Sequence, residues 1–342
     1  MMRSDELMVK VLTLGESLLR LSTTPNERLR HLSELRVVFG GAEANVAHNL
    51  AMLGNKVRYA TKVPANELAQ NIYYELNAVG VDTQYIISKG SGRLGSYYVE
   101  VGSDLRASTV VYDRAFSEIA NMKEREWDLE SLFDGIDIFH TTGITLGLSK
   151  FWHEYLLELI KFAKSKGIKV VFDMNYRSGL WSQEEAKQAF VKVLPYVDVL
   201  SANKLDAKHF MDIEIADESN SENFLEQIAQ KYPNVEAIFG TNRISMTPNA
   251  YQLTGFYYDT ETKKVFHSKK HQIQYVVDRV GAGDAYAAGI IDGIIKHRDP
   301  QSVVEFAMAS SVLKHTIFGD ANWFTTEQVE QFMKTSGGNI IR

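Results

Sequence analysis

The feature that most constrains this chain is a short glycine-rich turn near its C-terminal end, after an apolar run. The turn is Gly281-Ala282-Gly283, and Asp284 follows at once. Glycine adopts positive φ angles without steric cost and lets backbone N–H groups approach a ligand closely. The predicted helix that follows, about 284–296, directs unpaired N–H groups and its positive dipole end at the same point. The stretch therefore predicts an anion-binding cradle.

Asp284 allows two interpretations. An aspartate at a helix N-terminus usually acts only as a cap that matches the helix dipole. Because this one follows a Gly-Ala-Gly turn, it is also a candidate general base beside developing negative charge. The chain has no Walker-type G-x-x-x-x-G-K-[ST] sequence. A dinucleotide-binding motif needs a second strand after the helix, but Pro300 and a predicted helix, about 301–317, follow instead. A nicotinamide oxidoreductase is therefore disfavoured.

Composition indicates an ordinary globular protein. The 342 residues are 45% hydrophobic, which is enough for a full core. A net charge of -6 argues against nucleic-acid or membrane-surface partners. The absence of cysteine excludes disulfides, thiolate metal sites and cysteine nucleophiles, and the scattered histidines do not indicate a zinc site. No apolar run approaches the roughly 18 residues of a spanning helix. We expect a cytoplasmic protein with a short N-terminal tail, residues 1–8.

The order of predicted elements indicates the fold class. From about residue 136 onward, strands and helices alternate regularly, which predicts an α/β fold with a parallel sheet and helices on both faces. Strands with alternating polar and apolar residues interrupt this order within 16–39 and 93–114, and they predict a small separate sheet. A further extended region, about 252–277, has no obvious place in this scheme.

Polar residues follow four of the predicted parallel strands. In such sheets, ligands bind beyond the carboxyl ends of the strands. The polar groups at that edge are Thr141 to Gly143, Asp173 to Arg177, Asn203 with Asp206, and Gly240 to Arg243. Each group alone is compatible with capping or an ordinary loop. Four groups at one edge, together with the glycine cradle, predict a binding site.

Two motifs, taken together, resemble the signatures of the ribokinase-like (PfkB) carbohydrate kinases. The first is Gly40-Gly41-Ala42 followed by Asn45, and the second is the run 278–286 around the glycine cradle. The similarity spans about 9–330. It implies a single ribokinase-like kinase domain over those residues, in which the small sheet forms a lid over the site. It also implies a homodimer assembled through the lid sheets.

Three further segments are most similar to members of this family that act on 2-keto-3-deoxygluconate. They are 173–181, 111–114 and 313–320. The resemblance implies that ATP phosphorylates the terminal C6 hydroxyl of this sugar acid, giving 2-keto-3-deoxy-6-phosphogluconate. A fructokinase or another sugar or sugar-acid kinase of the same family is the alternative. The preference between the gluconate and galactonate epimers stays open. A sensor that has kept the fold without the chemistry is disfavoured by the intact glycine motif.

The resemblance also assigns roles residue by residue. Asp284 would be the base, and Gly281, Ala282 and Gly283 would hold the transferring phosphoryl group. The residues that would face the sugar acid are Gly41, Asn45, Tyr97, Tyr112, Arg114, Arg177, Asp284 and Asp320. The residues that would lie along the nucleotide are Asn175, Asn203, Gly240, Thr241 and again Gly281, Ala282 and Gly283. ATP and Mg²⁺ are the expected cofactors, Asp206 would reach the metal through water, and a monovalent cation such as K⁺ is an open further requirement.

The arginines bear on these assignments, and so do three positions at which the sequence departs from the family's usual motifs. A carboxylate in a pocket needs charge-assisted donors, and arginine offers a planar, bidentate match. Arg279 replaces the threonine that is commonest in the wider family's D-T-x-G-A-G-D sequence, which argues against a plain ribokinase. The family's N-x-x-E metal motif appears here with aspartate at 206. The segment 63–69 stands where many members have G-D-D-x-x-G, so lid closure is expected to differ.

Overall fold

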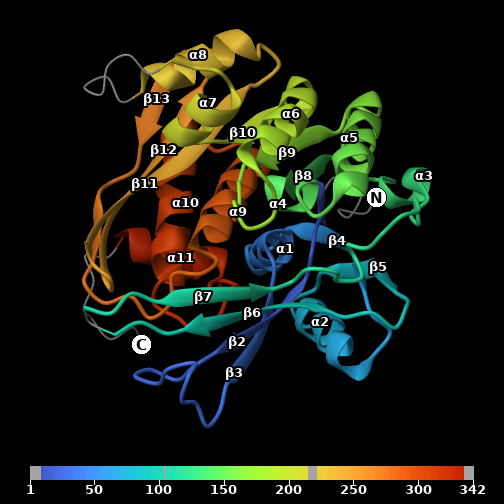
Figure 1. Cartoon of the computed structure of the whole chain (residues 1–342). Coiled ribbons are helices and arrows are strands. Elements are labelled where there is room, and N and C mark those ends of the chain that lie inside the picture. The colour runs from blue at the N-terminus through green and yellow to red at the C-terminus, as the bar shows by residue number, and fades with distance from the viewer. Residues whose placement is uncertain (1–8, 104, 215–221, 335–342) are drawn as a thin grey trace, which may run out of the picture.

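A largely parallel sheet lies at the centre of the molecule, as the alternation of strands and helices predicts. Figure 1 shows the computed structural model, in which residues 9–103, 105–214 and 222–334 are described. The predicted N-terminal tail, 1–8, lies outside these residues. Within them, the main sheet has ten strands in the order β13-β12-β11-β10-β9-β8-β1-β4-β5, and β14 pairs with β12.

The direction of the strands changes at one side of this sheet. Each adjacent pair of strands from β11 to β5 in this order is parallel. In contrast, β12 is antiparallel to β11, β13 and β14. The strands are β1 Lys10–Leu14, β4 Lys56–Val63, β5 Asp82–Ser88, β8 Ile138–Thr142, β9 Lys169–Asp173, β10 Val199–Ser201, β11 Ala237–Thr247, β12 Ala250–Asp259, β13 Lys264–His267 and β14 His271–Ile273. Parallel strands buried on both faces align their carboxyl ends along one edge. Asn175 and Asn203 follow β9 and β10 at that edge. Gly240 and Thr241, which were expected beyond a strand, instead lie within β11, where it continues past its parallel pairing with β10 and pairs with β12 alone.

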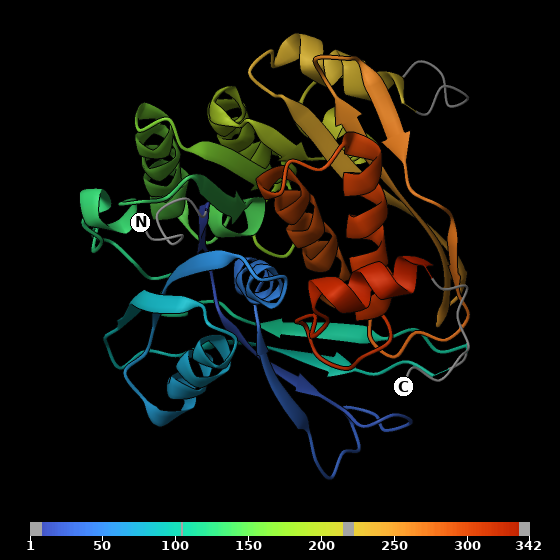
Figure 2. The same cartoon turned by 180° about the vertical axis from the view of Figure 1, so that it is seen from behind.

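Helices cover both faces of the main sheet and divide the core into two layers. Figure 1 shows α5, α6 and α7 on the near face, and Figure 2 shows α1, α9 and α10 on the other. Trp152 and Phe190 are buried in the first layer, and Tyr286 and Ala288 in the second. The helices are α1 Ala42–Met52, α2 Glu67–Ala78, α3 Leu129–Leu132, α4 Gly143–Leu146, α5 Lys150–Ser165, α6 Gln183–Val193, α7 Lys204–Phe210, α8 Asn223–Lys231, α9 Ala282–Ile295, α10 Pro300–Lys314 and α11 Thr326–Lys334, with a short 3-10 helix at Leu194–Tyr196. Among the described helices, none combines the length and apolarity of a membrane-spanning segment.

The lid is a separate four-stranded sheet, as the alternating segments predict. Its order is β3-β2-β6-β7, with β2 parallel to β6 and the two outer pairs antiparallel. Its strands are β2 Leu18–Ser22, β3 Arg36–Gly40, β6 Gly95–Glu100 and β7 Thr109–Asp113. Figure 1 places this sheet below the main sheet, beside α1.

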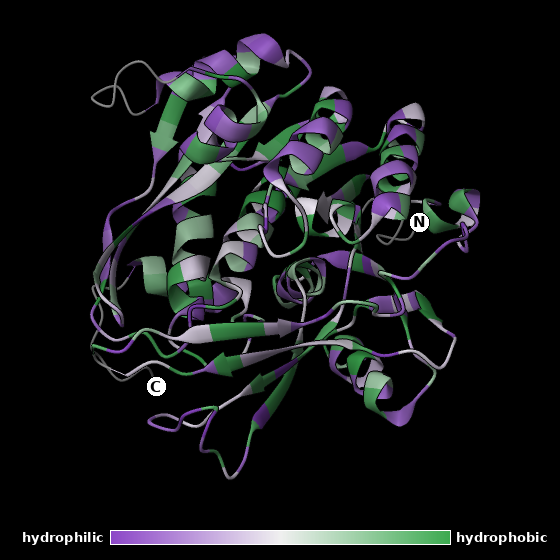
Figure 3. Ribbon diagram, in the orientation of Figure 1, coloured by the Kyte–Doolittle hydropathy of each residue, from purple (hydrophilic) through white to green (hydrophobic). Residues whose placement is uncertain are grey.

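The register of the lid strands separates its two faces. Arg20 pairs with Tyr97, and Tyr97 pairs with Tyr112, so all three lie on one face. Arg20 and Tyr97 are buried there. The opposite face carries Leu19, Leu21, Val37, Phe39, Tyr98 and Val111. Val37 is 51% and Val111 is 48% exposed, and the other four are partly buried, so this outer face is partly uncovered in the single chain. Figure 3 shows stretches of hydrophobic colour along the lid strands.

Two expectations about helix boundaries need correction. The helix after the glycine turn begins at Ala282, two residues earlier than expected, because Gly281 already acts as its N-cap. The next helix ends at Lys314 rather than near residue 317. The region 252–277 is extended as expected, and its strands β12, β13 and β14 extend the main sheet by antiparallel pairing.

Candidate active site

The glycine turn of the predicted cradle lies at the N-terminus of α9. Gly281 has a φ of 80°, in the left-handed region that favours glycine, and a Cβ there would overlap the carbonyl oxygen of Asp320. A Cβ at Gly283 would meet open space. No side chain caps α9, and the N–H of Ala282 donates to the carbonyl oxygen of Arg279 at 3.3 Å. The N–H groups of Gly283 and Asp284 in the same first turn are therefore the ones that can meet an anion.

Asp284 lies in the first turn of α9 and contacts the other glycine motif. The Nδ2 of Asn45 donates a hydrogen bond of 2.6 Å to Oδ2 of Asp284, across 239 residues of sequence. Burial raises the pKa of Asp284 to about 7, the Asn45 bond opposes this rise, and the carboxylates of Asp173, Asp320 and Glu43 add to it. A carboxylate with a pKa near neutrality is suited to accept a proton from a weakly acidic hydroxyl.

The first glycine motif places Asn45 by its backbone. Gly41 is the N-cap of α1 with a φ of 134°, and a Cβ there would overlap the carbonyl oxygen of Glu16. The N–H of Asn45 donates to the carbonyl oxygen of Gly41 at 2.7 Å. A side chain at Gly40 would overlap Asp320. Both glycines are therefore needed to bring α1 and the first lid strands against the cradle.

Glu43, two residues before Asn45 in α1, joins this helix to β8 and α4. It is fully buried and accepts hydrogen bonds from the backbone N–H of Thr142 at 3.1 Å and its Oγ1 at 2.8 Å. The Oγ1 of Thr145 donates a third bond of 2.7 Å. Burial raises the pKa of Glu43 to about 7, and these hydroxyl groups oppose the rise. Glu43 was not among the predicted site residues, because nothing in its local sequence indicates that it points toward β8 and α4.

A buried charge cluster ties the lid to the cradle. Arg20 of β2 is 1% exposed and lies 2.7 Å from carboxylate oxygens of both Asp278 and Asp320. The hydroxyl of Tyr97 also donates to Asp320. Asp320 and Tyr97, which were expected to face the sugar acid, are both buried and lie close to the cradle. Arg20 was missed, since an arginine in an alternating strand gives no sign of which face is buried.

Arg114 and Tyr112 lie next to the same face of the lid. Arg114 is 8% exposed, and its Nε donates to Glu16 at 2.8 Å while Nη2 contacts the same carboxylate. Ser117 also donates to Glu16. The Arg114 guanidinium lies over the ring of Tyr112, 5.9 Å from its centroid. The predicted substrate arginine thus has a buried acidic partner that the sequence did not reveal, and among the described residues its Nη1 has no hydrogen-bond partner.

A pocket of about 460 Å³ opens beside Gly283. It is lined by all of the remaining residues expected along the nucleotide, which are Asn175, Asn203, Gly240 and Thr241. Its volume is in the range of small-molecule sites. Arg177, which was expected near the sugar, instead lines this pocket and donates to the carbonyl oxygen of Tyr176 at 3.0 Å.

Asp206 and Asn203 form a capping box at the start of α7. Asn203 Oδ1 accepts from the N–H of Asp206 at 3.2 Å, and Asp206 Oδ2 accepts from the N–H of Asn203 at 2.9 Å. Burial raises the pKa of Asp206 to about 7, and Asp173 contributes to that rise. Asp173 itself was not assigned a role, although its pKa is also raised by burial.

The carboxylates here do not form a preorganised metal cage. No group of three metal-ligating side chains occurs in the described part of the chain. Asp206 and Asp173, which line the same pocket, are the carboxylates that would face a divalent cation bound with the nucleotide. Such a cation would relieve the mutual repulsion of these acids.

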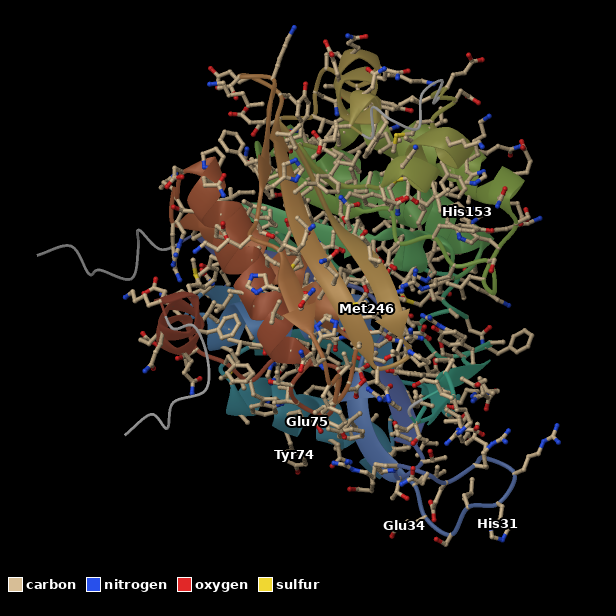
Figure 4. All side chains as sticks on the ribbon, turned by 90° about the vertical axis from the view of Figure 1, so that its left-hand side faces the viewer. His31, Glu34, Tyr74, Glu75, His153 and Met246 are labelled. Carbon is tan, nitrogen blue, oxygen red and sulfur yellow. The ribbon has the colours of Figure 1, made fainter. Side chains whose placement is uncertain are left out.

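Pocket size alone does not locate the site. A wider groove of about 890 Å³ lies along α5 and α6 and includes none of the motif residues. A further cavity, of about 490 Å³, lies between the lid and the β11–β12 ribbon and reaches Arg20, Asp278 and Arg279. In Figure 4, Met246 marks that ribbon, and His31 and Glu34 mark the protruding end of the lid.

A mostly parallel α/β sheet, a separate four-stranded sheet and two glycine-started helices that meet at Asp284 are the arrangement of the ribokinase-like fold. The sequence matches the pfkB family of carbohydrate kinases over residues 8–324, and the chain belongs to that family.

Solved structures and a curated relative agree with this assignment. A PfkB family carbohydrate kinase from Listeria grayi is 40% identical, with a TM-score of 0.92, covering 95% of this chain and 100% of the other. A 2-dehydro-3-deoxygluconokinase from Thermotoga maritima is 37% identical, with a TM-score of 0.91, covering 96% and 99%. A 2-dehydro-3-deoxygalactonokinase from Haloferax volcanii is 28% identical over 333 residues, which are 97% of this chain and 99% of that one.

The position of Asp284 leads to a first prediction. Asp284→Asn should fold normally and lose about 10²-fold or more in kcat, because an amide cannot accept the hydroxyl proton. In the wild-type protein, the base must be unprotonated, so kcat/KM should fall as the pH drops through about 7.

The control for this variant is Asp134→Asn, which changes an exposed aspartate. It should leave both the rate and the pH profile unchanged. Near-normal turnover by Asp284→Asn would remove Asp284 from the mechanism. The same conclusion would follow if the residual kcat/KM of this variant fell at low pH just as that of the wild-type protein does.

Proposed function

We propose that this protein transfers the γ-phosphoryl group of ATP to the C6 hydroxyl of 2-keto-3-deoxygluconate, also called 2-dehydro-3-deoxygluconate. The observation that carries the proposal is the position of Asp284. It lies beside the open space at Gly283, on an uncapped helix end, and is oriented by Asn45 at 2.6 Å. A base and an anion cradle at one point are what phosphoryl transfer to a hydroxyl requires.

In the proposed reaction, Asp284 takes the hydroxyl proton as the sugar oxygen attacks the γ-phosphorus atom. The bond from that phosphorus to the β–γ bridging oxygen breaks, and ADP leaves. The N–H groups at the start of α9 stabilise the charge that the phosphoryl oxygens carry in the transition state. Mg²⁺, when bound with the nucleotide, neutralises phosphate charge. The pocket at Asn203 and Thr241 would hold the nucleotide against Gly283.

The proposed substrate class, a sugar acid, rests on Arg114 beside the lid. The Arg114 guanidinium uses Nε and Nη2 on Glu16, which leaves Nη1 for a substrate carboxylate near Tyr112. Relatives named for sugar acids support this reading, and they include both the gluconate and the galactonate epimers. Other relatives are named 5-dehydro-2-deoxygluconokinase, so that acid is the second candidate.

The proposal is tested by a substrate panel with ATP and Mg²⁺. The panel contains 2-keto-3-deoxygluconate, its galactonate epimer, 5-dehydro-2-deoxygluconate, gluconate, fructose and ribose. The highest kcat/KM should belong to one of the two 2-keto-3-deoxy acids, and we expect the gluconate form. A preference for fructose or ribose would contradict the sugar-acid proposal, and an absence of ATP turnover with every sugar would favour a sensor.

Arg114 gives the second prediction. Arg114→Met should lower kcat/KM for the preferred acid by about 10²-fold or more, because the substrate carboxylate loses its charged partner. Turnover of a neutral hexose, which never uses that charge, should change much less.

Glu16 supplies the control for this experiment, because removing Arg114 alone leaves a buried carboxylate unpaired. The double variant Arg114→Met with Glu16→Gln removes both charges and should recover thermal stability but not activity on the acid. Recovery of acid turnover in the double variant would mean that Arg114 only balances Glu16.

We also propose that the protein forms a homodimer through the outer face of the lid. That face carries apolar side chains from all four strands, with Val37 and Val111 about half exposed. An exposed apolar face of this kind on an open sheet is typical of an interface. A second copy is the occupant that the face fits by symmetry, since the same apolar surface can meet itself across a two-fold axis.

The third prediction follows from this face. Val111→Glu should convert the dimer into a monomer, because it buries a charge in an apolar contact. Sedimentation at several concentrations measures the change, and Val191→Glu on α6, 44% exposed in the wild-type chain, is the matched control. A wild-type protein that sediments as a monomer at every concentration would contradict the proposed interface.

A further inference from the structure

Lys314 is a buried cation that the proposed reaction does not use. It is the last residue of α10 and is 0% exposed. Its Nζ makes long contacts with the carbonyl oxygens of Asp278, at 3.5 Å, and Ile317, at 3.4 Å. Burial lowers the pKa of Lys314, while the carboxylates of Asp278 and Asp320 oppose that change. The ammonium group therefore lies among oxygen atoms of the segments on either side of it.

The two backbone segments around Lys314, 277–281 and 315–320, carry the cradle. The N–H of Val277 donates to the carbonyl oxygen of His315 at 2.8 Å, and the N–H of Gly319 donates to Asp278 Oδ2 at 3.1 Å. Gly281 contacts the backbone of Asp320 so closely that a Cβ would not fit. The segments 277–281 and 315–320 are thus joined directly beneath the start of α9, and Lys314 lies at their junction.

The charges at this junction balance without any further ion. Asp278 and Asp320 supply two negative charges, and Arg20 and Lys314 supply two positive charges. Backbone carbonyl oxygens and carboxylates are also the ligands that a K⁺ ion would take at such a place. An ammonium group has the same charge and seeks the same oxygen atoms.

We propose that the Lys314 ammonium is the resident cation of this junction, so that the enzyme needs no monovalent metal ion for activity. Lys314 acts as a positioning residue: it holds the carbonyl groups of the two segments together and thereby fixes the position of Gly281 and the N–H groups of α9. A metal ion has no place at the junction while the side chain is present.

The wild-type protein provides the first test. Its kcat/KM and its thermal unfolding temperature should be the same in K⁺ and in tetramethylammonium, at equal ionic strength and with Mg²⁺ present. The kinetic measurement rests on the proposed function, whereas the unfolding temperature does not. A clear requirement for K⁺ in either measurement would overturn the inference.

Removing the ammonium group provides the second test. Lys314→Ala leaves space and should lose about 10-fold or more in kcat/KM, since charged partners are left buried. K⁺ or ethylammonium should restore much of the rate and raise the unfolding temperature, and tetramethylammonium, being too large, should do neither. Lys192→Ala, which changes an exposed lysine of α6, should respond to none of these ions.

A third variant separates cation replacement from packing. Lys314→Met fills the same space with an apolar chain, so its lost activity should not return with K⁺ or ethylammonium. If Lys314→Ala keeps wild-type activity, or stays inactive with every small cation, Lys314 is not the resident cation. If neither variant folds, the wild-type comparison between K⁺ and tetramethylammonium still decides the question.

Discussion

The hydrogen bond between Asn45 and Asp284 is the contact on which the rest of the site depends. It joins two helix N-termini, α1 and α9, that are 239 residues apart in sequence. Each helix start needs a glycine: Gly41 because of its close approach to Glu16, and Gly281 because of its close approach to Asp320. The glycines therefore serve two purposes, since they expose N–H groups and allow the segments to pack closely enough for the two side chains to meet.

The lid is joined to this contact by buried charge rather than by apolar packing alone. Arg20 reaches from β2 to both Asp278 and Asp320, and the lid's own buried apolar cluster contains only a few residues. Ion pairs of this kind contribute little net stability, but they penalise any arrangement that leaves one charge unpaired. The cluster therefore fixes how the lid meets the cradle, while Arg114 and Glu16 do the same at the neighbouring position.

The fold and the centre of the site could be predicted from sequence because their signals are local. Alternation of period two marked the lid strands, and the alternation of strands with helices marked the parallel sheet. The glycines and Asp284 stand next to each other, so a helix N-terminus with an acid was visible directly. The antiparallel extension by β12 to β14 was missed, since a strand's sequence does not specify which neighbour it pairs with.

The charged partners could not be predicted for a related reason. Arg20 and Asp320 are 300 residues apart, and Arg114 and Glu16 are 98 apart, so neither pair leaves a pattern in the local sequence. Lys314 belonged to a recognised segment, but only the folded chain shows that its ammonium group is buried. The chemistry of this site is thus set by long-range pairs around a motif that is itself short.

The proposed role of Asn45, which is to orient Asp284 and tune it as a base, is tested most directly by a pH–rate profile of Asn45→Ala. The amide donates to the carboxylate and so lowers the pKa of Asp284 from the value that burial alone would give. Without that donor, the acid limb of kcat/KM, expected near pH 7 in the wild-type protein, should move to higher pH. A limb that stays in place or moves to lower pH would contradict the account.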